Sequence, residues 1–473
     1  MATGRVVRLS RCVVIVGALL GAAACTIAPL QPAGAAVPVP QASATSAKGV
    51  AQQVGATGPQ GRMSRSERED MLARLGEQGK APLVNRHLAA MTRFGDVDLH
   101  AHNDAKLLID GPATFAAMFA AIGAARESVL LESYIIEDST IADRLAELLE
   151  RKRRQGVAVA LLYDDVGTLK PPQAFFDRLR AAGVGLCAFN PVNPLKRLGY
   201  WNISHRDHRK ILAVDRTVAF TGGINISGVY ATGSFSRGQR ASNVGWRDTQ
   251  VQLRGPAAGA LDDLVRKTWQ QQGCRDALPP MPARANAASA GEQVVRIVPS
   301  SPADPANRIY TLLLTAVDAA QQSVYLTMAY FAPSPDMIDA LCDAAGRGVD
   351  VQLVLPSQSD FWPVLHAGRS HYRRLLAAGV KVHELQDAVL HAKTAVIDGV
   401  VSTVGSSNMD WRSISSNNEV DAVVFGDDFG QGMVRMFRQD VAASEAITAE
   451  AWAHRPLLQR AKEWLARNFD GLW

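Results

Sequence analysis

The sequence lacks a long hydrophobic run beyond its N-terminal segment. After residue 25, no stretch approaches the roughly 18 unbroken apolar residues of a membrane-spanning helix, so we do not expect the body to cross a membrane. A strong charge of one sign is also missing, because the formal net charge is only +5 over 473 residues. Arg5, Arg8 and Arg11 supply part of it, and the remainder gives no argument for nucleic acid as a partner.

Cysteine is scarce as well, with five residues in the chain. Beyond the N-terminal segment only Cys187, Cys274 and Cys342 remain, widely spaced and without a CxxC pair. This pattern has neither the ligand spacing of a zinc site nor the density of a disulfide framework. We therefore predict buried free thiols and no metal site.

The N-terminus has the architecture of a signal peptide. Basic residues precede an apolar run, Cys12–Ala24, which ends in small side chains and is short for a membrane span. Two cleavage sites compete: Ala33–Ala35 fits an ordinary signal peptidase, whereas Leu20–Cys25 resembles a bacterial lipoprotein signal with Cys25 lipidated. We predict an export signal over residues 1–25 and a body in the bacterial periplasm, associated with the membrane.

The rest of the chain is long enough for two cores, and its composition divides it accordingly. Residues 26–68 and 277–291 are rich in small residues and proline and poor in large apolar ones. Such segments cannot bury a core, so we predict a flexible tether and a linker there. Two lobes would then span residues 69–276 and 292–473.

The two lobes repeat one pattern. Ala124–Leu131 matches Ala319–Leu326 where a helix leads into a buried strand, and Gly156–Val159 matches Gly348–Val351. Helix and strand signals alternate in both halves, which predicts an α/β fold of mixed sheets flanked by helices. Two copies of one lobe indicate a pseudo-twofold arrangement with the active site at the lobe interface. The protein would then be a monomer with an internal pseudo-dimer.

One motif occurs late in each half. Its histidine, lysine, aspartate, Gly-Gly or Gly-Ser pair and asparagine keep the same spacing in both copies. A single His-x-Lys would be weak evidence, but a doubled and complete motif is a strong signal. The members, first copy before second, are His208 and His391, Lys210 and Lys393, Asp215 and Asp398, Gly222–Gly223 and Gly405–Ser406, and Asn225 and Asn408.

These residue types suit the chemistry of a phosphodiester. On a strand, residues i and i+2 project to one face, so each histidine lies beside its lysine. The two lysines, with Asn225 and Asn408 as amide donors, can hold the non-bridging oxygens, and the glycines permit close backbone approach to a ligand. One imidazole can attack phosphorus while the other protonates the leaving alkoxide. We therefore expect no metal and no cofactor.

Each histidine also needs an acceptor that orients its second ring nitrogen. Asp248 lies downstream of the first motif and Glu419 downstream of the second, so each is the candidate for the histidine of its own half. Asp215 and Asp398 complete the catalytic motif, and we expect them to act by tying the motif loop.

The doubled motif resembles that of the phospholipase D superfamily, and within it most that of bacterial cardiolipin synthases. The likeness extends from about Asp96 to Ile447. The resemblance implies that His208 is the nucleophile and His391 the acid, a division that the sequence itself leaves open. The other segments that carry it are Glu132–Tyr134, Asn202–Lys210, Trp246–Asp248, Ala329–Phe331, and Asn408–Ser413 leading to Asn418–Glu419.

The resemblance implies a phosphatidyltransferase that works through a phosphohistidine, joining two phosphatidylglycerols into cardiolipin with release of glycerol. A hydrolytic phospholipase D would use the same residues with water as acceptor. A superfamily nuclease is disfavoured by the modest charge and the export signal, and an inactive lipid-binding lipoprotein would be expected to lack a motif residue. The implied partners are a phospholipid and a membrane surface, and no nucleic acid.

Three segments outside the motifs carry weaker signals. His205 could contact substrate or lie in a loop, and the insertion Gly233–Asn243 predicts a flexible flap. Residues 457–473 predict an amphipathic helix with an apolar stripe from Leu457 to Phe469. We expect that stripe to pack against the second lobe, with contact to a membrane interface as the alternative.

Overall fold

The computed structural model of the chain describes seven ranges of residues, which are 46–75, 80–168, 173–193, 204–234, 245–281, 289–304 and 306–468. The predicted signal, the first part of the predicted tether, most of the predicted flap and the middle of the predicted linker lie outside these ranges. Within them, no helix is both long enough and apolar enough to cross a membrane.

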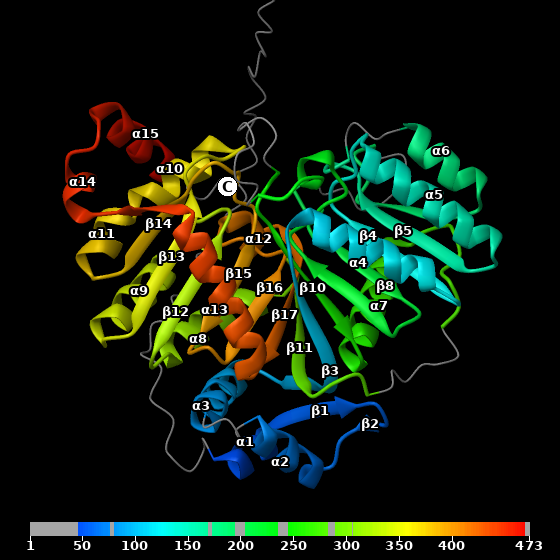
Figure 1. The fold of residues 1–473 in the computed structure, drawn as a ribbon, viewed down its shortest axis with the longest axis horizontal. Helices are drawn as coiled ribbons and strands as arrows, with labels where there is room; N and C mark the ends of the chain where they lie inside the picture. The colour runs from blue at the N-terminus through cyan, green and yellow to red at the C-terminus, as the bar shows by residue number, and fades with distance from the viewer. Residues whose placement is uncertain are drawn as a thin grey trace, which may run out of the picture. The chain divides into compact units, whose positions relative to one another are not determined.

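The N-terminal lobe is a mixed sheet covered by helices (Figure 1). Its elements are β3 Val97–Ile109, α4 Asp110–Ala124, β4 Ser128–Ser133, α5 Thr140–Arg154, β5 Ala158–Asp164, α6 Gln173–Ala181, β6 Gly185–Phe189, β7 Arg206–Asp207, β8 Ile211–Val214, β9 Val218–Gly222, η3 Gly228–Tyr230, β10 Thr249–Arg254 and α7 Pro256–Gln272. Strands β6, β5 and β4 are parallel, and an antiparallel run then leads from β4 through β8, β9 and β10 to β3.

The C-terminal lobe repeats this order. Its elements are β11 Gln293–Ser300, α8 Arg308–Ala319, β12 Ser323–Met328, α9 Pro335–Gly346, β13 Asp350–Pro356, α10 Trp362–Ser370, α11 Tyr372–Ala377, β14 Lys381–Leu385, β15 Lys393–Ile397, β16 Val401–Gly405, α12 Trp411–Ser415, β17 Asn417–Phe425, α13 Asp427–Ala442, β18 Ser444–Ile447, α14 Ala449–Ala453 and α15 Leu457–Arg467. Strands β14, β13 and β12 are parallel, and β15, β16, β17 and β11 follow antiparallel. The predicted pair of similar α/β lobes is confirmed.

The central strands of both sheets are buried on both faces. All residues of β4 and β15 are buried, as expected for strands near the centre of a helix-covered sheet. Helix α5 shows the matching amphipathic pattern, with Leu145 and Leu149 buried and a run of basic residues in its last turn. Its N-cap, Ser139, accepts a hydrogen bond from the amide of Ala142.

The long strand β3 joins the two sheets. Its first part pairs with β11 of the C-terminal lobe, and its second part pairs with β10 of the N-terminal lobe. One core continues across this junction, because α7 and α13 contribute Leu261 and Met433 to a cluster that also holds Val251 and Val404. The lobes therefore share buried surface, which fixes the relative positions of the two motif strands.

The predicted tether over residues 26–68 is wrong from residue 46 onward. This part of the chain forms α1 Ala47–Gln53, β1 Val54–Gly58, β2 Gly61–Arg62 and the start of α2 Arg65–Arg74, followed by α3 Ala81–Met91 and η1 Thr92–Phe94. Strand β1 pairs parallel with β3. Val50, Val54 and Ala56 join the core of the C-terminal lobe, so a segment with few apolar residues folds without a core of its own.

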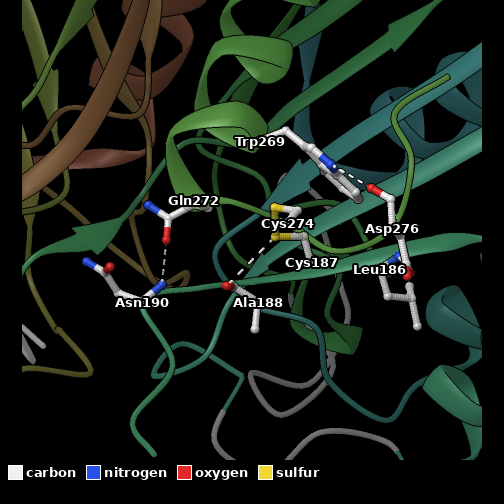
Figure 2. The surroundings of a disulfide bond; sticks show 8 residues. All are labelled: Leu186, Cys187, Ala188, Asn190, Trp269, Gln272, Cys274 and Asp276. Carbon is white, nitrogen blue, oxygen red and sulfur yellow. Dashed lines mark hydrogen bonds between the residues drawn. A yellow bond between two sulfur atoms is a disulfide. The ribbon is translucent and has the colours of Figure 1, made fainter. Parts of the chain in front are cut away.

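The prediction of free thiols is wrong for two of the three cysteines in the body. Cys187 at β6 and Cys274 after α7 form a disulfide between residues 87 positions apart, with their Cα atoms 5.6 Å from each other (Figure 2). Nearby, the indole N–H of Trp269 donates to the carbonyl oxygen of Asp276 (3.1 Å). Linear spacing gave no sign of the pair, because only the packing of α7 on the sheet brings the two together. Cys342 is free and partly buried.

The predicted packing of the C-terminal apolar stripe is also wrong. Helix α15 buries Glu463 and Ala466, while Leu457, Trp464 and Leu465 on its opposite side are exposed. The small alanine and the paired glutamate fit against the lobe, so the helix presents its apolar side outward. Phe469 lies outside the described residues.

Candidate active site

The two motif strands lie where the lobes meet, and each is bordered by backbone from the other lobe. The amide of His208 donates to the carbonyl oxygen of Asn418 (3.0 Å), and the amide of His391 donates to that of Arg247 (2.7 Å). Strand β7 pairs parallel with the start of β17 in the same region. In each case the accepting residue immediately precedes the candidate orienting acid.

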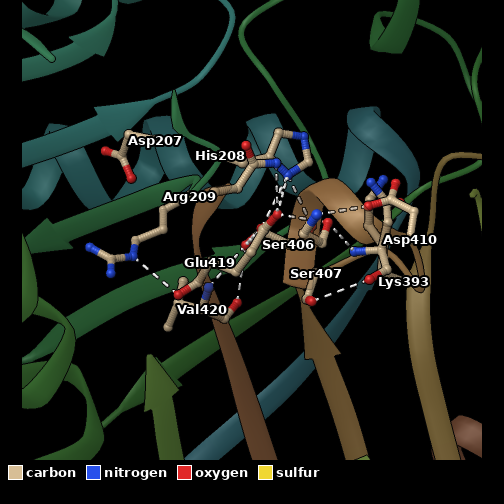
Figure 3. A network of polar contacts seen from close by, with 12 residues as sticks. Asp207, His208, Arg209, Lys393, Ser406, Ser407, Asp410, Glu419 and Val420 are labelled. Atoms are coloured by element: carbon tan, nitrogen blue, oxygen red, sulfur yellow. Dashed lines mark hydrogen bonds and ion pairs between the residues drawn. The ribbon is translucent and has the colours of Figure 1, made fainter. Parts of the chain in front are cut away.

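As a consequence, the orienting acids are exchanged between the lobes. Figure 3 shows one of the two contacts, that of Glu419 with His208. Both carboxylate oxygens of Glu419 lie 3.1 Å from Nδ1 of His208, and Oδ2 of Asp248 lies 2.7 Å from Nδ1 of His391. The expectation that each acid serves the histidine of its own half is therefore wrong. Strand pairing across the lobe interface delivers each acid to the opposite histidine.

These contacts determine which ring nitrogen is left for chemistry. An ionised carboxylate only accepts hydrogen bonds, so Nδ1 of His208 and of His391 carries the hydrogen. The carbonyl oxygen of Ser406 is a further acceptor, 3.1 Å from Nδ1 of His208. Nε2 of each ring is then unprotonated in the neutral imidazole and able to act as a nucleophile or base.

Glu419 is held as an anion. Burial opposes its ionisation, but His208 and Lys210, together with hydrogen bonds, outweigh this effect and lower its pKa. The hydroxyl of Ser406 donates to Oε2 (2.6 Å), and that of Ser413 donates to Oε1 (2.9 Å). His208 itself has a lowered pKa, mainly because it is buried.

The acid on the other side is more easily protonated. Burial raises the pKa of Asp248 to about 6, although the nearby Lys393 favours the anion. His391 is buried beside Lys393 and Lys210, and its pKa lies well below the ordinary value. The hydroxyl oxygen of Tyr230 lies 3.1 Å from the same Nδ1 atom. The two histidines therefore have similar partners but different charge environments.

The two motif lysines form a buried cationic pair. Nζ of Lys210 donates to the carbonyl oxygen of His208 (2.5 Å), and Nζ of Lys393 donates to that of His391. Burial lowers the pKa of Lys210 to about 7 and that of Lys393 to about 8. Lys210 also faces the ring of Tyr134, 5.1 Å from its centroid. A bound anion would restore the charge on both ammonium groups.

The carboxylates of the motif aspartates accept hydrogen bonds from backbone amides. Asp215 accepts hydrogen bonds from the amides of Arg126, Glu127 and Ser128 (all 2.8 Å). Asp398 accepts the equivalent bonds from residues 321–323 and contacts Nε2 of His87 at 2.9 Å. Both carboxylates thus connect a turn of the motif to the start of a central strand.

The motif glycines make room for protein atoms instead of the ligand we expected. A Cβ at Gly223 would lie 2.2 Å from Oδ1 of Asp248, and one at Gly405 would lie 1.8 Å from Oδ1 of Asp421. A Cβ at Gly222 would lie 2.3 Å from the carbonyl oxygen of Thr249. These positions need glycine because the acid-bearing strands pass so close to them.

The motif asparagines are buried near the histidines. Oδ1 of Asn225 accepts from the amide of Ile135 (3.2 Å), which leaves its amide group as a donor. Among the described residues, Oδ1 of Asn408 has no hydrogen-bond partner. His205, which we considered as a substrate contact, is hydrogen-bonded through Nε2 to Asn418 Oδ1 (2.8 Å) and so supports the start of β17.

Two residues that contact a motif histidine or its orienting acid were missed in the sequence analysis. Tyr230 contacts His391, but it lies in a stretch without a counterpart in the second half, so the repeat gave no sign of it. Ser413 holds Glu419, and it lies within the segment Asn408–Ser413 that we had singled out by resemblance. A search for hydroxyls near the second motif would have found Ser413.

The comparisons with known proteins agree with this geometry. The family described as "Cardiolipin synthase, PLD-like domain" matches residues 118–235 and 313–441, which contain both motifs. The chain belongs to the cardiolipin synthase, PLD-like domain family. Cardiolipin synthase of Geobacillus kaustophilus (strain HTA426) is 34% identical over 395 residues, covering 83% of this chain and 77% of the relative. Cardiolipin synthase A of Pseudomonas entomophila (strain L48) is 36% identical over 366 residues, covering 77% of this chain and 74% of the relative.

A solved structure shares the fold at low sequence identity. The crystal structure of phosphatidylserine synthase from Haemophilus influenzae Rd KW20 aligns with a TM-score of 0.56 at 11% identity, covering 77% of this chain and 92% of that one. At this identity the likeness concerns the fold alone. Membership in the cardiolipin synthase, PLD-like domain family confirms the predicted superfamily and the prediction of a phospholipase D superfamily phosphatidyltransferase. In the part of the chain that the structure describes, no group of three or more His, Cys, Asp or Glu residues is placed to hold a metal ion.

Proposed function

We propose that this protein is a phosphatidyltransferase that condenses two phosphatidylglycerols into cardiolipin, releases glycerol and works through a phosphohistidine. One observation carries the proposal. Two histidines, each hydrogen-bonded through Nδ1 to a carboxylate, lie beside two buried lysines. Such a group suits an anionic diester that must be held while phosphorus becomes five-coordinate. The choice of cardiolipin is supported by the relatives that bear the name cardiolipin synthase.

In the first half-reaction, Nε2 of His208 attacks phosphorus of one phosphatidylglycerol and forms a P–N bond. The bond from phosphorus to the oxygen of the glycerol headgroup breaks, and His391 protonates that oxygen. Glycerol leaves, and a phosphatidyl group remains on His208. Lys210 and Lys393 stabilise the non-bridging oxygens during the step.

In the second half-reaction, His391 removes the proton from a headgroup hydroxyl of another phosphatidylglycerol. The resulting oxygen attacks phosphorus, the P–N bond breaks, and cardiolipin leaves His208 free. If water were the acceptor instead, the product would be phosphatidic acid. The hydrolytic phospholipase D activity is therefore a competing outcome of one and the same site.

The difference between the two acids supports His208 as the nucleophile. An imidazole gains positive charge when Nε2 bonds to phosphorus. Glu419, with its lowered pKa, keeps a negative carboxylate beside Nδ1 that stabilises this charge. Burial, together with Lys393 and Lys210, lowers the pKa of His391 well below its ordinary value, so its protonated form is a ready proton donor. The negative charge of the bound phosphate would allow His391 to be protonated before the step.

We also propose that the protein works outside the bacterial cytoplasm, at a membrane surface and as a monomer. The disulfide Cys187–Cys274 supports export, because such bonds persist in oxidising compartments such as the periplasm. A phospholipid substrate requires access to a membrane. Both copies of the motif lie in one chain, so one subunit supplies a complete pair of histidines. Lipidation at Cys25 lies outside the described residues and stays a prediction.

Lipid analysis tests the proposal directly. Expression of the chain in a cardiolipin-deficient bacterium should restore cardiolipin, whereas matched His208→Asn and His391→Asn variants should not. The purified protein should convert phosphatidylglycerol into cardiolipin and glycerol in equal amounts. Phosphatidic acid as the main product would assign the site to hydrolysis, and no turnover of any phospholipid would contradict the proposal.

A further inference from the structure

Six large apolar side chains are exposed on two helices of the C-terminal lobe that pack against each other, and we call them the α15 face. Four lie on helix α15, which packs against α10, and two lie at the start of α10 (Figure 1). Single exposed hydrophobics are common, but six on two neighbouring helices are not, so a binding partner is expected for this group. Its members and their exposed fractions are Leu457 77%, Leu458 69%, Trp464 67%, Leu465 44%, Phe361 40% and Trp362 53%.

The α15 face cannot turn inward, because the opposite side of the helix is fixed. Glu463 accepts hydrogen bonds from the guanidinium of Arg455 (2.7 to 3.1 Å), and both side chains are largely buried. Ala466 is buried in a small core with Val364 and Ala367 of α10. At 100° per residue, these anchors lie on the side of the helix away from Leu457 and Trp464. The outward position of the stripe is therefore built into the packing.

Charge on α15 points to an anionic partner. Arg460 and Arg467 border the apolar stripe on one side and Lys462 borders it on the other, and all three are exposed. The only acidic residue of the helix is Glu463, which is buried with Arg455. An apolar stripe that contains tryptophan and is flanked by cations is typical of helices that lie in a membrane interface.

Tyr330 lies between the α15 face and His391 and contacts residues on both sides. The hydroxyl of Tyr330 donates to Asp360 (2.8 Å), the residue just before Phe361. The ring of Tyr330 packs on the core that contains Ala466, and its centroid lies 6.4 Å from that of His391. A surface that rested on the α15 face would therefore lie close to the proposed reaction centre.

We propose that the α15 face docks the enzyme on an anionic phospholipid bilayer and so brings the histidines to substrate in the membrane. This inference rests on the proposed function, since a phospholipid substrate is what makes a bilayer the natural partner. A second copy of the chain is a poorer match. A twofold interface through the same stripes would bring its cationic borders together without an acid to meet them.

Vesicle binding of the full exported chain tests the docking. The probes are vesicles of phosphatidylcholine with and without phosphatidylglycerol, assayed by flotation. The double variant Trp464→Ser, Leu465→Ser should partition into the phosphatidylglycerol vesicles roughly tenfold or more weakly than wild type. A control with equally exposed apolar side chains elsewhere, Phe94→Ser with Met281→Ser, should bind like wild type, since these residues are 48% and 52% exposed outside the α15 face.

A second pair of variants tests the charge. Arg460→Glu with Arg467→Glu should remove the preference for vesicles that contain phosphatidylglycerol and leave the weaker binding to phosphatidylcholine. All variants change exposed side chains, so their thermal unfolding should match that of wild type. Equal preference for anionic vesicles after charge reversal would overturn the electrostatic part of the proposal.

Turnover separates this inference from the proposed function. On monomeric short-chain phosphatidylglycerol, which needs no docking, the Trp464→Ser, Leu465→Ser variant should match wild type, whereas on vesicles it should be roughly tenfold slower or more. Wild-type protein inactive on both substrates would refute the proposed function. Equal loss on both substrates, or binding and turnover unchanged on vesicles, would overturn the docking. A dimer in sedimentation that the variant dissociates, with vesicle binding unchanged, would assign the face to self-association.

Discussion

Glu419 and Asp248 each orient a histidine of the opposite lobe, and a single change of charge tests their role. Glu419→Gln keeps the size of the side chain but removes the negative charge that faces Nδ1 of His208. An amide can also donate to Nδ1 and so favour the wrong tautomer. We expect kcat to fall by about 10² to 10⁴-fold with little change in KM.

Steady-state kinetics on phosphatidylglycerol measure this effect. Glu445→Gln, on the exposed part of β18, is the matched control and should keep the wild-type kcat. A Glu419→Gln enzyme with wild-type kcat would show that the carboxylate does not act on the reaction. A rise in KM with an unchanged kcat would assign Glu419 to substrate binding alone.

The buried lysines and Asp248 predict the pH dependence of kcat/KM. Burial lowers the pKa of Lys210 to about 7 and that of Lys393 to about 8, so raising the pH through this range removes the charges that bind phosphate. Burial raises the pKa of Asp248 to about 6, so lowering the pH below that value protonates the acceptor of His391. We expect a bell-shaped profile with its maximum between pH 6 and pH 7.

The Lys210→Arg variant tests whether deprotonation of Lys210 causes the alkaline limb of the pH profile. The guanidinium of this variant keeps its charge at every accessible pH. The alkaline limb of its kcat/KM profile should therefore move to higher pH, even if the maximal kcat/KM falls. Profiles of kcat/KM on monomeric substrate measure the shift. A wild-type value that keeps rising from about pH 7 to about pH 9 would be incompatible with protonated lysines as phosphate ligands.

At the scale of elements, the disulfide fastens β6 to the end of α7. Cross-linking residues 87 positions apart restricts the unfolded chain, so loss of the bond should lower the free energy of unfolding by about 2 to 5 kcal/mol. Cys187→Ser and Cys274→Ser should show this loss, and Cys342→Ser should show little. Denaturant unfolding with and without a reducing agent measures it. Equal stability under both conditions would mean that the bond does not form in the protein as produced.

The repeat was the part of the fold that the sequence could predict. Both motif copies keep their offsets because each is one strand, one turn and one more strand, so local spacing carries the geometry. The apolar runs of β4 and β15 likewise reveal strands buried on both faces. Lobe architecture and motif residues could therefore be predicted from spacing and pattern.

Contacts made at long range could not be predicted in this way. Cys187 meets Cys274 only through the packing of α7, and Glu419 meets His208 only through strands that cross between lobes. Composition also led to the wrong prediction of a tether over residues 46–68. These residues fold because Val50 and Val54 pack into the core of the C-terminal lobe. For α15, an apolar stripe indicated burial, whereas the packing of Ala466 turned that stripe outward.

At the scale of the whole molecule, neither lobe contains a complete site. Each histidine comes from one lobe and its orienting acid from the other, and a fully buried pair, Arg247 with Asp440, holds the interface with hydrogen bonds of 2.7 and 2.8 Å. Duplication of one lobe thus supplies two similar histidines whose surroundings differ. We propose that this difference divides nucleophile from acid within one subunit.

The most direct test of a phosphohistidine on His208 is the detection of that adduct. The reagent is a phosphatidyl ester with a leaving group that needs little protonation, so that loss of the acid is tolerated. After a rapid quench, His391→Asn should carry acid-labile, base-stable phosphate on His208, located by mass spectrometry, and His208→Asn should carry none. An adduct on His391 in the His208→Asn enzyme and none in His391→Asn would contradict the assignment, and no adduct in either would contradict covalent catalysis.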